Sequence, residues 1–219
     1  MLETIKILFE RGGYPVMASI TICLVIAVII IIERTYRFWF VYDLANTDAF
    51  MAHIQKMIMN NSIENAIRSC KKMRPKLLPF VLSEGLKRSN DSSKEIENAL
   101  EYASLASSPK IMKAVPLLGT IANVATLLGL LGTLFGLMKS FAAAANATGA
   151  QKQTLLAEGI AEALTATSFG LSTALLCLLA YGFLTWKQTS ILDGINQHSS
   201  KLLDLLYTRK IKIQSKRSA

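Results

Sequence analysis

Residues 114–138 read AVPLLGTIANVATLLGLLGTLFGLM, a run of 25 residues without a charged side chain, closed by Lys113 and Lys139. A bilayer has a hydrocarbon core about 30 Å thick, so roughly 20 apolar residues of helix are enough to cross it. A helix that is apolar all round is either the core of a large protein or a membrane span. The run is unbroken and long enough to span with tilt, so this stretch favours the membrane span.

Two further runs have the same character. Val16–Ile32 is free of charge and is closed by Arg34, with Trp39 beyond it as an interfacial aromatic residue. No small-residue cleavage site follows it, so we interpret this run as a retained anchor. Ile160–Trp186 is the third run, and its one carboxylate, Glu162, lies near its start. The sequence therefore predicts three transmembrane helices.

The composition agrees with a membrane protein. Apolar residues make up 52% of the chain and charged residues 18%, and the mean hydropathy is +0.37. The three cysteines lie far apart and show no CxxC spacing, which argues against a disulfide scaffold or a zinc site. The net charge of +9 is compatible with binding to nucleic acid, so the distribution of the charges along the chain decides whether this is expected.

The basic residues predict the orientation. Thirteen Lys and Arg lie between the first and second runs and seven follow the third, whereas two precede the first run and two lie between the second and third. By the positive-inside rule the N-terminus lies outside and the C-terminus inside. The basic excess thus marks the cytoplasmic side, and we predict no nucleic-acid partner.

The expected fold is an all-α membrane protein with three transmembrane helices and a cytoplasmic helical extension. We delimit an N-terminal periplasmic segment (1–15), a first span (16–33), a cytoplasmic helical loop (34–112), a second span (113–139), a periplasmic loop (140–158), a third span (159–186) and a cytoplasmic helical, basic tail (187–219).

Local signals place helices in the cytoplasmic parts. Residues 61–64 (NSIE) predict a helix start at Asn61, and residues 92–95 (SSKE) predict a capping box. The third span continues without a strong helix breaker, so we expect one long helix. Its basic end fits either binding to anionic lipid or, as the favoured alternative, a solvated and frayed terminus. His53 and His198 are interpreted as isolated surface residues.

Small and hydroxylated residues gather on one face of the second and third spans. The positions advance by three or four residues, which places them on one side of each helix. They are Thr126, Gly129, Thr133 and Gly136 in the second span, with Gly132 in a GxxxG pair, and Thr167, Gly170 and Ala174 in the third. Such faces permit close helix packing, and Thr133 and Thr167 lie at a similar depth in an antiparallel pair.

Two explanations of these threonines stay open at this point. A membrane threonine commonly bonds back to its own helix, which favours plain packing. Hydroxyls can also replace the water around an ion, which favours an ion pathway. Glu162 fits either a costly carboxylate facing protein or water, or a hydrated group near the outer interface.

Residues 127–138 (LLGLLGTLFGLM) and 158–171 (EGIAEALTATSFGL) together resemble the paired signature of the ExbB/TolQ/MotA family of ion-driven motor subunits. Three spans make the chain similar to the ExbB/TolQ branch. The resemblance implies a homopentamer around a single-span dimer of the ExbD/TolR type. It further implies proton flow, with a TonB/TolA-like effector as a possible further partner.

The resemblance also assigns residues. Thr133 and Thr167 match the conduction-path threonines of the family, and Glu162 matches its acidic position. The family usually has proline where this chain has Thr126. The added hydroxyl makes sodium an alternative to the proton.

We therefore expect a multi-pass protein of the bacterial inner membrane that forms the channel of a motor. It needs no cofactor, metal or catalytic residue, because the transported ion is a proton or, alternatively, sodium. No HExxH, GxSxG or GxGxxG motif occurs. A passive membrane scaffold and a transporter subunit are the remaining alternatives, although a transporter would show duplicated halves or broken helices.

Overall fold

The computed structural model describes residues 14–42, 47–73 and 75–218. All regular structure within these residues is helical, and no strand occurs among them. Three of the helices are long and apolar enough to cross a membrane. These findings confirm the all-α membrane class. The expected N-terminal segment 1–15 lies outside the described residues except for Tyr14 and Pro15, which are already helical.

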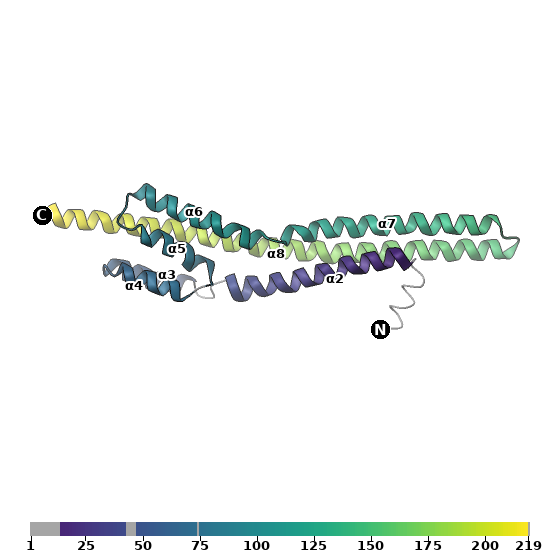
Figure 1. The fold of residues 1–219 in the computed structure, drawn as a ribbon, viewed down its shortest axis with the longest axis horizontal. Helices are drawn as coiled ribbons and strands as arrows, with labels where there is room; N and C mark the ends of the chain where they lie inside the picture. Colours follow the sequence, from purple (N-terminus) through teal and green to yellow (C-terminus); the bar gives the residue numbers. More distant parts are fainter. Residues whose placement is uncertain (1–13, 43–46, 74, 219) are drawn as a thin grey trace. The chain divides into compact units, whose positions relative to one another are not determined.

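The chain divides into two compact units (Figure 1), one of residues 1–33 and 114–184 and the other of residues 34–113 and 185–219. The first unit holds the start of helix α2 (Tyr14–Tyr36), helix α7 (Val115–Ala145) and helix α8 (Ala150–Ser218) as far as Leu184. Helices α7 and α8 form an antiparallel hairpin, and Val16 of α2 packs against Gly132 of α7.

The apolar surface of the first unit is mostly uncovered. Helix α2 buries a stripe that includes Met17, Ile20 and Ala27, while Ile22 and Ile29 on its other faces are more than half exposed. In the three apolar windows only 28–33% of residues are buried. The remaining surface is suited to contact with lipid or with neighbouring chains, because exposing so much apolar surface to water would be unfavourable.

The connection between α7 and α8 is shorter than hydropathy indicates. Helix α7 continues to Ala145 and α8 starts at Ala150, so the segment delimited as loop 140–158 is helical apart from residues 146–149. Gly149 has a φ of +55°, a left-handed conformation that glycine adopts without steric cost. The apolar run marks where lipid contact ends, and both helices continue past it.

The second unit is built from short helices and the rest of α8. A π-helical segment η1 (Arg37–Tyr42) follows α2, and helices α3 (Thr47–Met59), α4 (Ile63–Lys72), α5 (Leu77–Lys87) and α6 (Ser93–Met112) follow in order. Contacts join α3 to α4, α4 to α5 and α5 to α6. Short connections between such neighbours make successive helices antiparallel, so α4 and α6 run in the same direction.

The two predicted helix starts differ in outcome. At α6 the capping box is present: Ser92 Oγ accepts from Glu95 N (3.3 Å) and Glu95 Oε2 accepts from Ser92 N (2.8 Å). These bonds hold the pKa of the Glu95 carboxyl below its usual value. At α4 the predicted start at Asn61 is wrong, because Asn61 adopts a left-handed φ of 61° and Ser62 is the N-cap residue.

The end of α8 contacts the turns of the second unit. Helix α8 is one helix to Ser218, as expected for the tail. Arg209 donates to Asn61 Oδ1 (2.5 and 3.1 Å), and Lys210 donates to the Asp91 carbonyl oxygen (3.1 Å). At 1.5 Å per residue, Arg209 lies roughly 33 Å along the helix from Lys187. These two cations therefore have protein partners far from the apolar end of the span.

The titratable side chains of His198 and Cys70 are buried in this unit. His198 is 6% exposed, so its interpretation as a surface residue is wrong, whereas His53 is exposed as expected. Burial lowers the pKa of His198. Cys70 is fully buried, and burial raises the pKa of its thiol to about 12.

Candidate functional site

The small residues of α7 and α8 form the contact between these two helices. A methyl group at Gly170 would lie 2.7 Å from the Ala125 carbonyl oxygen and 2.9 Å from Gly129 Cα. Real side chains almost never approach backbone that closely, so only glycine permits this spacing. The structure buries all five residues that we assigned to packing: Gly129, Gly132, Gly136, Gly170 and Ala174.

The close approach at Gly129 links the two predicted pathway threonines. Thr167 of α8 donates its hydroxyl hydrogen to the Gly129 carbonyl oxygen across the interface, at 3.0 Å. In a continuous α-helix the same carbonyl also accepts from the backbone N–H four residues later, which belongs to Thr133. One carbonyl oxygen therefore joins Thr133 and Thr167, and both side chains are half-buried.

The hydrogen bonds of the threonines decide what they can still bind. Thr133 donates to the Leu130 carbonyl oxygen (2.6 Å), and Thr126 donates to the Ala122 carbonyl oxygen (3.0 Å). A hydroxyl has one hydrogen to donate and two lone pairs that accept. Because Thr126, Thr133 and Thr167 each donate to a backbone carbonyl, their lone pairs remain available to a hydrogen-bond donor or a cation.

Glu162 has a partner that the sequence analysis missed. Lys139 Nζ lies 3.1 Å from Glu162 Oε2, and the Glu162 side chain is 20% exposed against 74% for Lys139. The carboxylate is thus a member of an ion pair between α7 and α8. Its partner can be inferred once the hairpin register is known, because Gly136 opposes Ala163 one turn away from the pair.

The threonines and the ion pair lie on opposite flanks of the hairpin. At about 100° per residue, Thr133 is roughly 40° beyond Gly129, and Thr167 is roughly 60° beyond Gly170. Lys139 and Glu162 are each about 80° from these glycines in the opposite sense. Because the two helices face each other and run antiparallel, rotation in the same sense about each helix axis leads to the same side of the hairpin. We call the side of Thr126, Thr133 and Thr167 the threonine flank.

Helix α2 lies on the other flank. Its Val16 Cγ1 would be 3.1 Å from a methyl group at Gly132, which is turned toward the ion-pair side of α7. The threonine flank therefore lies away from the contact between α2 and α7. On this flank Thr126 is exposed and Thr133 and Thr167 are half-buried.

A second polar crossing lies nearer the turn of the hairpin. Ser140 Oγ of α7 donates toward the Leu155 and Leu156 carbonyl oxygens of α8 (3.2 and 3.4 Å). A side chain at Gly159 would collide with Ser140. This contact helps to fix the register of the hairpin, because the serine of one helix packs against the glycine of the other.

The chemistry available at this site is that of neutral oxygens. Among residues 14–42, 47–73 and 75–218 no cluster of three or more His, Cys, Asp or Glu side chains is arranged to hold a metal ion. Between residues 114 and 186 the sequence contains two carboxylates, Glu158 and Glu162. By helix rotation neither of these two carboxylates lies on the threonine flank.

Most of the chain matches a known protein family, and several known proteins are similar to it. A model described as the MotA/TolQ/ExbB proton channel family matches residues 50–197, which include all of α7 and Thr167 of α8. The putative biopolymer transport protein ExbB-like 3 of Synechocystis is 35% identical over 161 residues, which make up 70% of this chain and 72% of that protein.

Two further relatives match shorter stretches. The Tol-Pal system protein TolQ of Haemophilus influenzae is 43% identical over 77 residues, 35% of this chain and 33% of TolQ. The biopolymer transport protein ExbB of Xanthomonas campestris pv. campestris is 28% identical over 124 residues, 57% of this chain and 49% of that protein. The chain thus spans about a third to a half of these two relatives.

Proposed function

The chain belongs to the MotA/TolQ/ExbB proton channel family, in its ExbB/TolQ branch, and from this premise we propose that it is the channel-forming subunit of a motor that couples proton flow to movement of a partner. It is a multi-pass membrane protein of a transport family and not of a known enzyme class. The bacterial inner membrane is the proposed location, because a proton-driven motor needs an energised bilayer.

We propose that the working assembly is a homopentamer around a single-span dimer of the ExbD/TolR type, with a TonB/TolA-like effector as a further partner. The family supports this assembly, and so does the uncovered apolar surface of the first unit. The sequence of the three spans has no carboxylate deep in the membrane, which also supports a partner chain in the assembly. An aspartate on the partner helix would supply the group that takes up and releases the proton.

The observation that carries the proposal is the hydrogen bond from Thr167 to the Gly129 carbonyl oxygen. This bond commits the hydroxyl hydrogen of Thr167, and the bond to Leu130 commits that of Thr133. Both hydroxyls then offer lone pairs at one depth of the hairpin. Lone pairs at fixed positions accept hydrogen bonds from a protonated water or a protonated carboxyl, which is the task of a proton path.

Thr126 and Glu162 have lesser roles in this proposal. Thr126 extends the threonine flank by two turns from Thr133. Glu162 is paired with Lys139 on the opposite flank of the hairpin, so we propose that it affects the outer end of the pathway only indirectly.

The test is ion flux in liposomes that contain the complex with its single-span partner. We expect Thr133→Val and Thr167→Val to assemble normally and to lose flux, whereas the serine variants retain part of it. Glu162→Gln is expected to reduce flux less. Thr165→Val is the matched control, because Thr165 bonds back to Ala161 (2.7 Å) and lies on a different face of α8.

Flux unchanged in both valine variants would remove these residues from the pathway. Equal loss in Thr165→Val would show a general effect of deleting a hydroxyl from α8. Sodium-driven flux is the alternative outcome that one observation favours. Thr126 stands where the family usually has proline, and its hydroxyl donates to the Ala122 carbonyl oxygen. If a sodium gradient alone drove flux, Thr126 would be assigned as a ligand of the sodium ion.

A further inference from the structure

The second unit carries two charged helix faces that are complementary in sign. On α4, Glu64, Arg68 and Lys71 lie on one exposed face, because their spacing of four and three residues follows the helix period. On α6, Lys94, Glu97 and Glu101 lie on one exposed face for the same reason. In chain order the charges read minus, plus, plus on α4 and plus, minus, minus on α6.

None of these six side chains takes part in an ion pair within the described part of the chain. Their charges are therefore available to another molecule. The two faces cannot meet within one chain, because α5 contacts both α4 and α6 and Figure 1 shows α6 and α4 on opposite sides of this unit.

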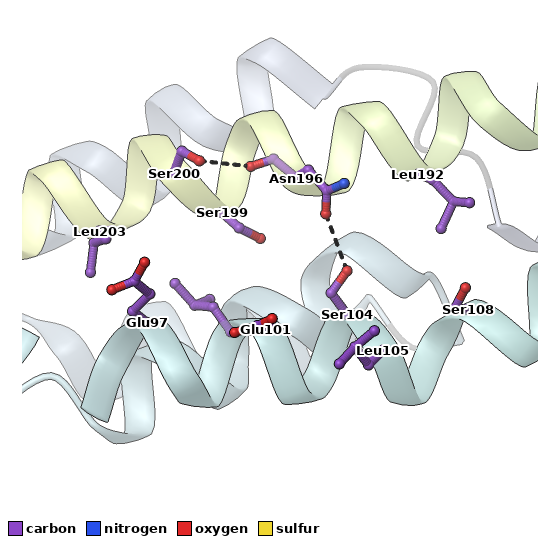
Figure 2. Close-up of a pocket in the computed structure, with 11 residues that line it drawn as sticks. Glu97, Glu101, Ser104, Leu105, Ser108, Leu192, Asn196, Ser199, Ser200 and Leu203 are labelled. Carbon is purple, nitrogen blue, oxygen red and sulfur yellow. Dashed lines mark hydrogen bonds between the residues drawn. The ribbon is translucent and has the colours of Figure 1, made fainter. Parts of the chain in front are cut away.

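The α6 face also borders a groove. Figure 2 shows Glu97 and Glu101 at the α6 edge of a groove of about 530 Å³, whose far wall is α8 with Ser199 and Leu203. Ser104 Oγ donates to Asn196 Oδ1 (3.2 Å) across its floor. The exposed Leu105, on the same helix, adds an apolar contact beside the charges. The two carboxylates make this edge complementary in sign to a helix with a basic face.

We propose that this occupant is α4 of a second copy of the chain, so that the α6 face of one copy docks on the α4 face of the next. The inference rests on the proposed ring and names the cytoplasmic surfaces that close it. A contact between two different patches of the same chain is heterologous, and heterologous contacts close into rings when the rotation permits. An isologous contact would give dimers instead.

The directions of the helices agree with this arrangement. Helices α4 and α6 run the same way within one chain, and rotation about the membrane normal preserves that direction between copies. In a parallel pairing Glu64 meets Lys94, Arg68 meets Glu97, and Lys71 meets Glu101. Every position then opposes a charge of the other sign, whereas an antiparallel pairing would bring like charges together at both ends.

Disulfide trapping in membranes tests the contact with the full chain. The double variant Glu101→Cys/Lys71→Cys should give a ladder of crosslinked species under mild oxidation, and each single variant should give none. The native cysteines can stay, because Cys70 is buried with a raised thiol pKa and Cys23 and Cys177 lie in the spans. The matched control Glu101→Cys/Gln55→Cys moves the second thiol to α3 and should give no ladder.

Charge reversal then tests the pairing. Adding Glu97→Lys to the double-cysteine chain should lower the crosslinked fraction about tenfold or more, since like charges across an interface repel strongly. Adding Arg68→Glu as well should restore the ladder. All these positions are exposed, and circular dichroism of each variant monitors folding.

The outcomes separate this inference from the proposed ring. Native mass spectrometry of the unaltered complex reports the ring independently. A ring without a ladder in Glu101→Cys/Lys71→Cys would overturn the docking of α6 on α4 and leave the proposed function intact. Dimers from a single-cysteine variant, a ladder in the Gln55 control, or failure of Arg68→Glu to restore crosslinking would each overturn it too.

Discussion

Gly170→Ala is the sharpest test of the packing between α7 and α8. The added methyl group would lie 2.7 Å from the Ala125 carbonyl oxygen and 2.9 Å from Gly129 Cα. Both neighbours are backbone atoms, so no side-chain rotation can relieve the contact. Gly182→Ala is the matched control, because a methyl group at Gly182 meets no atom within 4 Å.

The magnitude follows from the geometry. To restore a contact of 3.4 Å the helices must separate by about 0.7 Å, and a gap of 0.5–1 Å forfeits a quarter to a half of each neighbouring dispersion contact. Overpacking of this kind costs about 1–3 kcal/mol. The separation also stretches the 3.0 Å bond from Thr167 to Gly129 beyond hydrogen-bond range. A polar contact between membrane helices is worth about 0.6 kcal/mol.

Comparison of the two variants isolates this cost. Both replace a helical glycine by alanine, so the gain of about 1 kcal/mol in helix propensity cancels between them. We expect Gly170→Ala to have a free energy of unfolding about 2–3 kcal/mol below that of Gly182→Ala. The measurement is an SDS titration in mild detergent followed by far-ultraviolet circular dichroism, at one protein concentration for both variants. Coincident transitions for the two variants would refute the close packing at Gly170.

Two further predictions concern the second unit. A cysteine introduced at the exposed Asn60 should react with a membrane-impermeant maleimide only after the inner membrane is opened. Reaction in intact spheroplasts would show that the predicted orientation is wrong. Native Cys70 should stay unreactive on either side, since burial raises the pKa of its thiol to about 12. Ser92→Ala should lower the free energy of unfolding by about 0.5–2 kcal/mol at pH 7 through loss of the cap. Because the folded pKa of Glu95 is lowered from 4.5, its stabilisation is complete above pH 4.5 and declines below it, and urea unfolding at pH 3 and pH 7 should show a smaller effect of Ser92→Ala at pH 3.

The features that the sequence predicted depend on local or one-dimensional signals. Apolar length identifies the three spans, and a serine three residues before a glutamate identifies the capping box of α6. The long α8 follows from the lack of a helix breaker after Trp186. Hydropathy overestimates the loop between α7 and α8, because residues 150–158 (AQKQTLLAE) mix polar with apolar residues and are mostly good helix formers.

The features that the sequence did not predict depend on tertiary register. Lys139 and Glu162 are 23 residues apart, and only the hairpin geometry makes them partners. The burial of His198 has the same origin, since a histidine on a long helix gives no local sign of which face is covered. The family resemblance grouped Glu162 with the threonines as a pathway candidate, whereas the helix rotation puts them on opposite flanks.

The four-residue turn between α7 and α8 bears on how the chain enters the membrane during synthesis. In the predicted orientation, residues 139–162 are the part of the hairpin that must be moved to the outer side. They contain two lysines and two glutamates and thus no net charge. Moving a unit charge across a membrane costs or releases about 2.3 kcal/mol per 100 mV. Insertion of the two helices as one hairpin is therefore nearly independent of the membrane potential that the finished motor would consume.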